Sequence, residues 1–170
     1  MNERSFQLKN YLSAMACCIA AVFLDQLTKH LSVIHLKGQE EIVLISGVFE
    51  LRYLENRGAA FGLFQNRQIF FMAGAVVIFL VIGILYRKIP RGRRFIPMKA
   101  CAVLICAGAL GNLIDRIRFR YVVDFLYFSL IDFPIFNVAD CYVVIACFLF
   151  AYLILFFYKE EELDWFAFFR

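Results

Sequence analysis

Charged residues are scarce in this sequence: Asp, Glu, Lys and Arg make up 19% of its 170 residues, whereas 63% of the residues are hydrophobic. A soluble domain is closer to half apolar. The mean hydropathy is +0.74, and phenylalanine alone contributes 21 residues. This composition leaves little room for a separate soluble domain and indicates an integral membrane protein.

Residues that bind metals or act as nucleophiles are few and poorly arranged. The two histidines, His30 and His35, fit no HExxH pattern, and the six cysteines all lie in apolar segments at spacings that match neither a zinc motif nor a disulfide framework. We interpret the cysteines as small buried apolar side chains. No serine or cysteine occurs in an elbow-like motif. We therefore expect no metal and no cofactor, although the residue types alone leave a carboxylate-bound metal open.

Acidic residues are absent between Arg87 and Lys99, where basic residues are dense. A basic loop between apolar segments is typical of the cytoplasmic side of a membrane protein, so we assign residues 87–97 to a cytoplasmic loop. Nucleic-acid binding would need a folded basic face with stacking aromatic residues, which the chain does not offer. We expect no nucleic-acid partner.

Four apolar segments are long enough to cross a bilayer, which takes about 20 residues. We expect spans at about 11–33, 69–86, 98–115 and 140–158. With the basic loop in the cytoplasm, both termini are cytoplasmic. The polar motifs then lie at the outer face.

The remaining segments predict a small sheet and an amphipathic tail. An apolar run at 42–45, a turn at Gly47 and alternating residues at 49–53 are typical of a hairpin within a β region at about 40–64. The aromatic tail, 159–170, is expected at the membrane interface. The expected fold class is an all-α integral membrane protein, a single domain with four transmembrane helices and a small extracytoplasmic β-hairpin or sheet.

Two aspartates stand out near the point where the third and fourth spans emerge on the same side. Acidic groups at the edge of a bilayer are costly unless they are paired or wetted. Asp124 and Asp140 flank this point and could share one proton. The ionised carboxylate would take a proton from water, while the protonated one donates a hydrogen bond to a scissile carbonyl.

Other polar residues near these aspartates suggest supporting roles. Asn112 and Asn137 could orient the carboxylates, whereas Asp115 adjoins Arg116 and is interpreted as its structural ion-pair partner. On the first span, Asp25 and Lys29 are four residues apart and can pair on one helical face. From spacing alone, a local ion pair without further function explains that pair equally well.

Five stretches of the sequence resemble the bacterial lipoprotein signal peptidase family, also called signal peptidase II. They occur in the family's order and are Asp25-Gln26-Leu27-Thr28-Lys29, Asn56-Arg57-Gly58-Ala59-Ala60-Phe61, Gly111-Asn112-Leu113-Ile114-Asp115-Arg116, Val122-Val123-Asp124-Phe125 and Phe136-Asn137-Val138-Ala139-Asp140. The resemblance implies a four-span aspartic endopeptidase with Asp124 and Asp140 as its catalytic pair. Its implied substrate-binding and supporting residues are Asp25, Lys29, Asn56, Arg57, Gly58, Asn112, Asp115, Arg116, Asn137 and Ala139.

The same resemblance implies the substrate and location. The substrate would be a diacylglyceryl-modified prolipoprotein, cut just before its lipidated cysteine. The enzyme would be a monomer in the bacterial cytoplasmic (inner) membrane, in contact with membrane lipid, with its active site at the outer face. Globomycin-like cyclic peptides would be expected to inhibit it.

Two other classes of function explain the acidic residues less well than a peptidase does. A proton-coupled transporter or channel subunit would carry acids through the depth of the membrane, whereas here they cluster at one end of the spans. A non-catalytic scaffold could use Asp140 as an acid in the first turn of the fourth helix, but that role does not account for Asp124.

Overall fold

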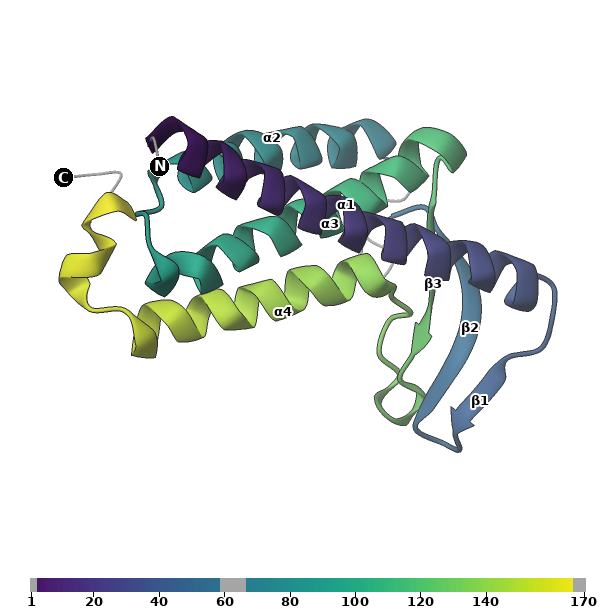
Figure 1. Ribbon diagram of the computed structural model, residues 1–170. Helices are drawn as coiled ribbons and strands as arrows, with labels where there is room; N and C mark the ends of the chain where they lie inside the picture. The colour runs from purple at the N-terminus through teal and green to yellow at the C-terminus, as the bar shows by residue number, and fades with distance from the viewer. Residues whose placement is uncertain (1–2, 59–66, 167–170) are drawn as a thin grey trace.

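Four long helices form a bundle with a small sheet at one end (Figure 1). The computed structural model describes residues 3–58 and 67–166. The helices are α1 (Glu3–Leu36), α2 (Gln68–Lys88), α3 (Ile96–Phe119) and α4 (Val138–Tyr152). Helix α3 is central, because α1, α2 and α4 all pack against it. Four helical segments are long and apolar enough to cross a membrane, as expected: Leu8–Leu36, Gln68–Lys88, Arg93–Phe119 and Val138–Phe157.

Proline and capping residues determine where the helices end. Helix α2 stops before Pro90, because a residue that precedes proline avoids the helical region, and Ile89 has φ −56° and ψ 125°. Helix α3 follows a short 3₁₀ turn, η2 (Arg93–Phe95), and carries Pro97 in its first turn, where the missing N–H costs nothing. It ends at Arg120, which adopts the left-handed conformation at φ 65°.

The sheet is antiparallel, with strands β1 (Ile42–Ile45), β2 (Phe49–Asn56) and β3 (Val122–Tyr127) in that order. The turn between β1 and β2 contains Gly47 at φ 69°, as the sequence predicted. Strand β3 comes from the connection between α3 and α4, outside the β region expected at about 40–64. Its register sets Asn56 opposite Val122 and Leu54 opposite Asp124. Part of the expected β region, residues 59–64, lies outside the described residues.

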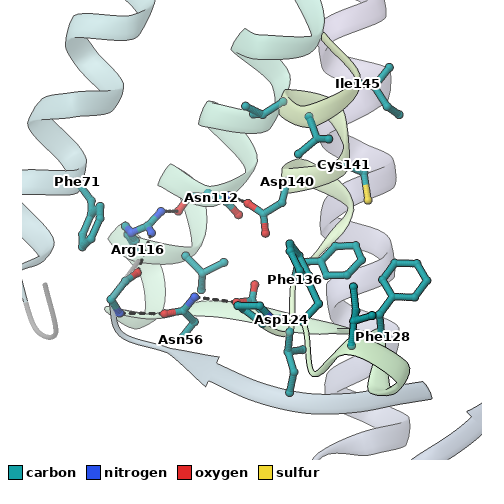
Figure 2. A pocket seen from close by; sticks show the side chains of 18 residues that line it. Asn56, Phe71, Asn112, Arg116, Asp124, Phe128, Phe136, Asp140, Cys141 and Ile145 are labelled. Carbon is teal, nitrogen blue, oxygen red and sulfur yellow. Dashed lines mark hydrogen bonds between the residues drawn. The ribbon is translucent and has the colours of Figure 1, made fainter. Parts of the chain in front are cut away.

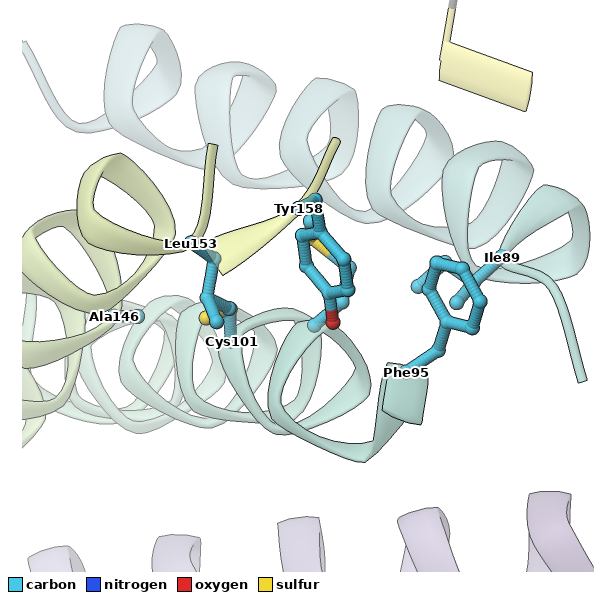
Figure 3. Packing of buried hydrophobic residues seen from close by; sticks show 7 residues of the cluster. Ile89, Phe95, Cys101, Ala146, Leu153 and Tyr158 are labelled. Atoms are coloured by element: carbon cyan, nitrogen blue, oxygen red, sulfur yellow. The ribbon is translucent and has the colours of Figure 1, made fainter. Parts of the chain in front are cut away.

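A cluster of buried apolar residues lies at the end of the bundle away from the sheet, where α2 and α4 end and α3 begins; Figure 3 shows its packing. The ring of Tyr158 stacks on Phe95 with centroids 5.1 Å apart, and its hydroxyl donates to the Arg94 carbonyl at 3.0 Å. The tail continues as a π-helical turn, η4 (Leu153–Phe157), and a 3₁₀ helix, η5 (Glu160–Phe166). Arg94 also pairs with Glu162. The tail is therefore tied to the loop between α2 and α3, while residues 167–170 lie outside the described part.

The interpretation of the cysteines as buried is correct for only some of them. Cys101 is buried in the cluster, but Cys17 and Cys147 are exposed. Composition indicates that such a residue lies in an apolar helix. It does not indicate which face of that helix packs against a neighbour.

Glycine permits the closest contact between α3 and α4. A Cβ atom on Gly108 would lie 2.5 Å from the carbonyl oxygen of Ala139 and 2.6 Å from Cγ2 of Val143. The first of these atoms belongs to the backbone of α4 and cannot rotate away. The N-terminal turn of α4, which carries Asp140, is therefore held against α3 by the absence of a side chain.

We predict that Gly108→Ala destabilises the protein by about 1–3 kcal/mol, because the added methyl group overpacks this contact. Thermal unfolding in detergent measures the effect. The matched control is Gly83→Ala on α2, where nothing lies within 4 Å of the added Cβ. Equal melting temperatures for the two variants would contradict the proposed constraint.

Candidate active site

The ammonium group of Lys29 joins α1 to α3 inside the protein. Its Nζ lies 3.0 Å from Asp25 Oδ2, 3.1 Å from Asp115 Oδ2 and 2.9 Å from Asn112 Oδ1. A lysine ammonium has three N–H donors, so all three have an acceptor. Asp25, Lys29 and Asp115 are 0%, 3% and 1% exposed. Buried charges are tolerated only when paired and hydrogen-bonded in this way.

The two carboxylates that hold Lys29 also accept hydrogen bonds from other elements. The backbone N–H of Ala139, at the start of α4, donates to Asp25 Oδ1 at 2.9 Å. The N–H of Val123, in β3, donates to Asp115 Oδ2 at 3.1 Å. Gln26 bridges both acids, donating to Asp115 Oδ1 at 2.9 Å and to Asp25 Oδ2 at 3.2 Å. One polar cluster thus fixes α1, α3, β3 and α4 relative to one another.

Beside this cluster, the carboxyl groups of Asp124 and Asp140 point toward one another (Figure 2). Three asparagine amides hold them. Asn56 and Asn137 donate to the two oxygens of Asp124 at 2.8 and 2.6 Å. Asn112 donates to Asp140 Oδ1 at 2.8 Å and accepts from Asn137 at 3.1 Å. Asn112 also accepts from the lysine, so the position of the two aspartates depends on the buried ion pairs.

Asp140 is fixed by the start of its own helix. Its Oδ2 accepts from the backbone N–H of Asn137 at 3.1 Å, and the Asn137 side chain accepts from the Asp140 N–H at 3.1 Å. This reciprocal pair is a capping box. The Asp140 carboxyl group therefore lies at the positive end of the α4 dipole.

Asp124 lies in strand β3 and is only 1% exposed. Burial, followed by repulsion from Asp140, raises the pKa of Asp124 from 3.8 to about 7, against the opposing effect of the amides of Asn56 and Asn137. The two carboxyl groups therefore differ in environment. Such a difference divides acid and base roles between neighbouring acids.

Arg116 completes the polar wall of the site. Its guanidinium donates to the carbonyls of Asn112 at 3.3 Å and Gly58 at 3.5 Å, and it lies 4.6 Å from the ring centroid of Phe71. Gly58 in turn donates its N–H to the side chain of Asn56 at 3.0 Å. The turn after β2 is thus held beside the two aspartates.

The aspartates open into a cavity of about 740 Å³ that is mostly apolar. Its polar residues are gathered on one side (Figure 2). The other walls come from the loop before α4 and from the outer face of that helix, and include Phe128, Ile131, Phe133, Pro134, Ile135, Phe136, Val143, Val144 and Ile145. A ligand with a polar group beside a large apolar group fits this distribution.

Comparisons with known proteins agree with this architecture. The family model described as signal peptidase (SPase) II matches residues 17–156. The chain belongs to the signal peptidase II family. A lipoprotein signal peptidase of Clostridium tetani is 42% identical over 146 residues, covering 84% of this chain and 90% of the relative. One of Brevibacillus brevis is 47% identical over 130 residues, covering 75% and 86%.

Two solved structures, each described as a bacterial membrane enzyme, are similar in fold. The first has a TM-score of 0.77 at 29% identity and covers 84% of this chain and 87% of that chain. The second has a TM-score of 0.75 at 29% identity, with coverage of 85% and 93%. This signal peptidase II family member is thus a multi-pass membrane protease.

Most residues named from the sequence of this signal peptidase II family member converge on the site, with two differences. Asp115 pairs with Lys29, not with Arg116, because adjacent residues of a helix point in different directions. Arg57 is exposed and lies over the ring of Tyr121, 5.8 Å from its centroid, rather than among the residues that line the cavity. Gly58 and Ala139 contribute backbone groups.

Sequence reasoning assigned no role to Gln26 or to the aromatic walls. Gln26 follows Asp25 in the motif Asp25-Gln26-Leu27-Thr28-Lys29, and this position could have indicated a role beside the Asp25–Lys29 pair. The loop aromatics, such as Phe128 and Phe133, gave none, because their sequence context matches any apolar connection. Within residues 3–58 and 67–166, no group of three or more His, Cys, Asp or Glu side chains is arranged to hold a metal ion.

We predict that Lys29→Met destabilises the protein by about 3–5 kcal/mol, because it leaves two buried carboxylates without their cation. The control is Lys37→Met. Lys37 pairs with Glu55 at 2.9 Å, but its side chain is 51% exposed, so the expected loss of stability is much smaller. Thermal unfolding of both variants measures the difference. Similar losses of stability in the two variants would contradict the prediction.

Proposed function

We propose that this protein removes the signal peptide from diacylglyceryl-modified prolipoproteins, cutting the peptide bond that precedes the lipidated cysteine. One observation carries the proposal: two carboxyl groups of different environment face each other at the polar side of a large apolar cavity. The names of the relatives, lipoprotein signal peptidases, support the substrate class. A lipid-anchored peptide has the matching combination of a polar bond and a large apolar group.

In the proposed mechanism, a water molecule lies between the two aspartates. The ionised carboxylate of Asp140 takes a proton from the water, and the oxygen of the water attacks the scissile carbonyl carbon. Asp124, protonated, gives its proton to the carbonyl oxygen, and a tetrahedral diol forms. Collapse of the diol breaks the C–N bond while Asp140 returns a proton to the leaving nitrogen, which becomes the amino group of the lipidated cysteine. Asp124 recovers its proton from the second hydroxyl.

The assignment of roles follows from the local environments. Asp140 is at the N-terminus of α4 and accepts from a backbone N–H and an amide, and we assign it as the base. Asp124 is more deeply buried, and its pKa of about 7 leaves about half of it protonated at pH 7 and most of it at lower pH, so we assign it as the acid. The amides of Asn56, Asn112 and Asn137 keep the two carboxyl groups facing each other throughout the reaction.

The proposed orientation puts both termini and the loop at 87–97 in the cytoplasm and the dyad at the outer face of the bacterial inner membrane. Strand β1 supports contact of the sheet with lipid, because its residues Ile42, Val43, Leu44 and Ile45 are 44–57% exposed. The apolar walls of the cavity would accept the acyl chains. We expect a monomer to suffice, and globomycin-like cyclic peptides to compete with substrate for the dyad.

Asp124→Asn and Asp140→Asn are each predicted to reduce cleavage by about 10³-fold or more, because either change removes one half of the acid–base pair. The assay uses a purified diacylglyceryl-modified prolipoprotein in detergent, with mass spectrometry of both products to locate the cut. An unmodified prolipoprotein tests the need for the lipid.

The matched control is Asp132→Asn. Asp132 is an exposed acid in the loop before α4, and asparagine tolerates its left-handed φ of 47°. This variant should cleave at nearly the normal rate. Near-normal cleavage by Asp124→Asn or Asp140→Asn, with intact folding, would rule out the dyad.

The pH dependence follows from the raised pKa of Asp124. The proton is retained until the pH rises through about 7, so kcat/KM should fall above that pH. Asn56 donates to Asp124 and favours its ionised form, so Asn56→Ala should move the fall to higher pH, by about 1 unit. The control Gln39→Ala, at an exposed position, should leave the pH at which kcat/KM falls unchanged. A shift to lower pH in Asn56→Ala would contradict the assignment.

A further inference from the structure

A second cavity lies at the end of the bundle that carries both chain termini, away from the sheet (Figure 1). Its volume is about 540 Å³, and it shares no lining residue with the cavity at the aspartates. Helix α1 and helix α3, with the turn before it, line most of the cavity, and α2 contributes Tyr86. Helices α1 and α2 both pack on α3, and they approach each other at Tyr11 and Tyr86, whose ring centroids are 5.7 Å apart.

The lining of this cavity changes from polar to apolar along the helices. On α1 it runs from Asn10 and Ser13 to Ala21, a rise of about 16 Å at 1.5 Å per residue. On α3 it runs from Lys99 to Leu104 in the same direction, toward the middle of the bundle. The polar end is therefore at the basic end of the spans and the apolar end is deeper in the membrane. An amphiphile with its head group at the surface fits this gradient.

The polar end carries two cations, Arg93 and Lys99. Among residues 3–58 and 67–166, the side chain of neither forms a hydrogen bond or ion pair with a protein group, whereas the side chain of their neighbour Arg94 is paired with Glu162. Lys99 is half-buried on a membrane-spanning helix. A cation in that position is costly without an anion, so an anionic group from outside the protein would be favourable here.

We propose that this cavity binds an anionic glycerophospholipid of the phosphatidylglycerol class. Its phosphodiester accepts from Lys99 and Arg93, and one acyl chain lies between α1 and α3 against Ala21 and Leu104. Basic pockets between membrane helices are known to take such head groups. A zwitterionic lipid fits less well, because no acid lies between residues 87 and 99 to pair with its ammonium group.

Native mass spectrometry of the purified full-length protein tests this proposal, with phosphatidylglycerol, phosphatidylcholine and inorganic phosphate added separately. Phosphatidylglycerol should bind at least about tenfold more tightly than phosphatidylcholine, and phosphate should not displace it. Because binding is read without cleavage, the result is independent of the proposed peptidase mechanism.

Three variants locate the site. The double variant Lys99→Gln/Arg93→Gln should weaken binding of phosphatidylglycerol by about tenfold or more, since hydrogen bonds to charged groups are among the strongest. Val103→Phe fills the apolar part without changing charge and should also weaken it. The control, Arg87→Gln/Arg118→Gln, removes the same charge at exposed positions outside the cavity and should bind as wild type does.

The proposal is overturned if the first double variant binds phosphatidylglycerol as tightly as wild type, or if the control loses binding equally. It is also overturned if phosphatidylcholine binds as well as phosphatidylglycerol. Displacement by inorganic phosphate would identify a phosphate site instead of a lipid site and would contradict it as well.

Discussion

The buried ammonium group of Lys29 is the interaction on which the rest of the site depends. It has three acceptors from two helices, and each acceptor has a second task. Asp25 holds the first turn of α4 through the Ala139 N–H, and Asp115 holds β3 through the Val123 N–H. Asn112 links Lys29 to the other two carboxyl groups, because it donates to Asp140 and accepts from Asn137, which donates to Asp124. A charge that cannot remain unpaired in an apolar bundle thereby fixes four elements at one point.

Close backbone packing complements this polar cluster. Gly108 lets α4 approach α3 until a side chain would collide with the Ala139 carbonyl, and a Cβ on Gly111 would lie 2.5 Å from Asp25 Oδ2. In a membrane, helices gain little from burying apolar surface against each other, so small residues and hydrogen bonds dominate their association. Both kinds of contact lie on the same stretch of α3, between Gly108 and Asp115.

The membrane architecture and the identity of the polar residues could be predicted from the sequence alone. Apolar runs of sufficient length predict the spans, and alternation with a glycine turn predicts the hairpin, because both signals lie within a few neighbouring residues. The acids at the ends of the spans were candidates because charge near a bilayer is costly. Asp25 and Lys29 could be paired from their spacing on one helix, and the structure places them 3.0 Å apart.

Which of these residues contact one another depends on how the helices and strands pack. Asp115 belongs to Lys29 on another helix, and β3 joins the hairpin through long-range pairing that no local pattern specifies. The bridging role of Gln26, the exposed position of Arg57 and the aromatic walls of the cavity likewise depend on how elements pack. The difference in environment between Asp124 and Asp140 has the same origin, because burial and helix position are properties of the assembled bundle and not of neighbouring residues in the chain.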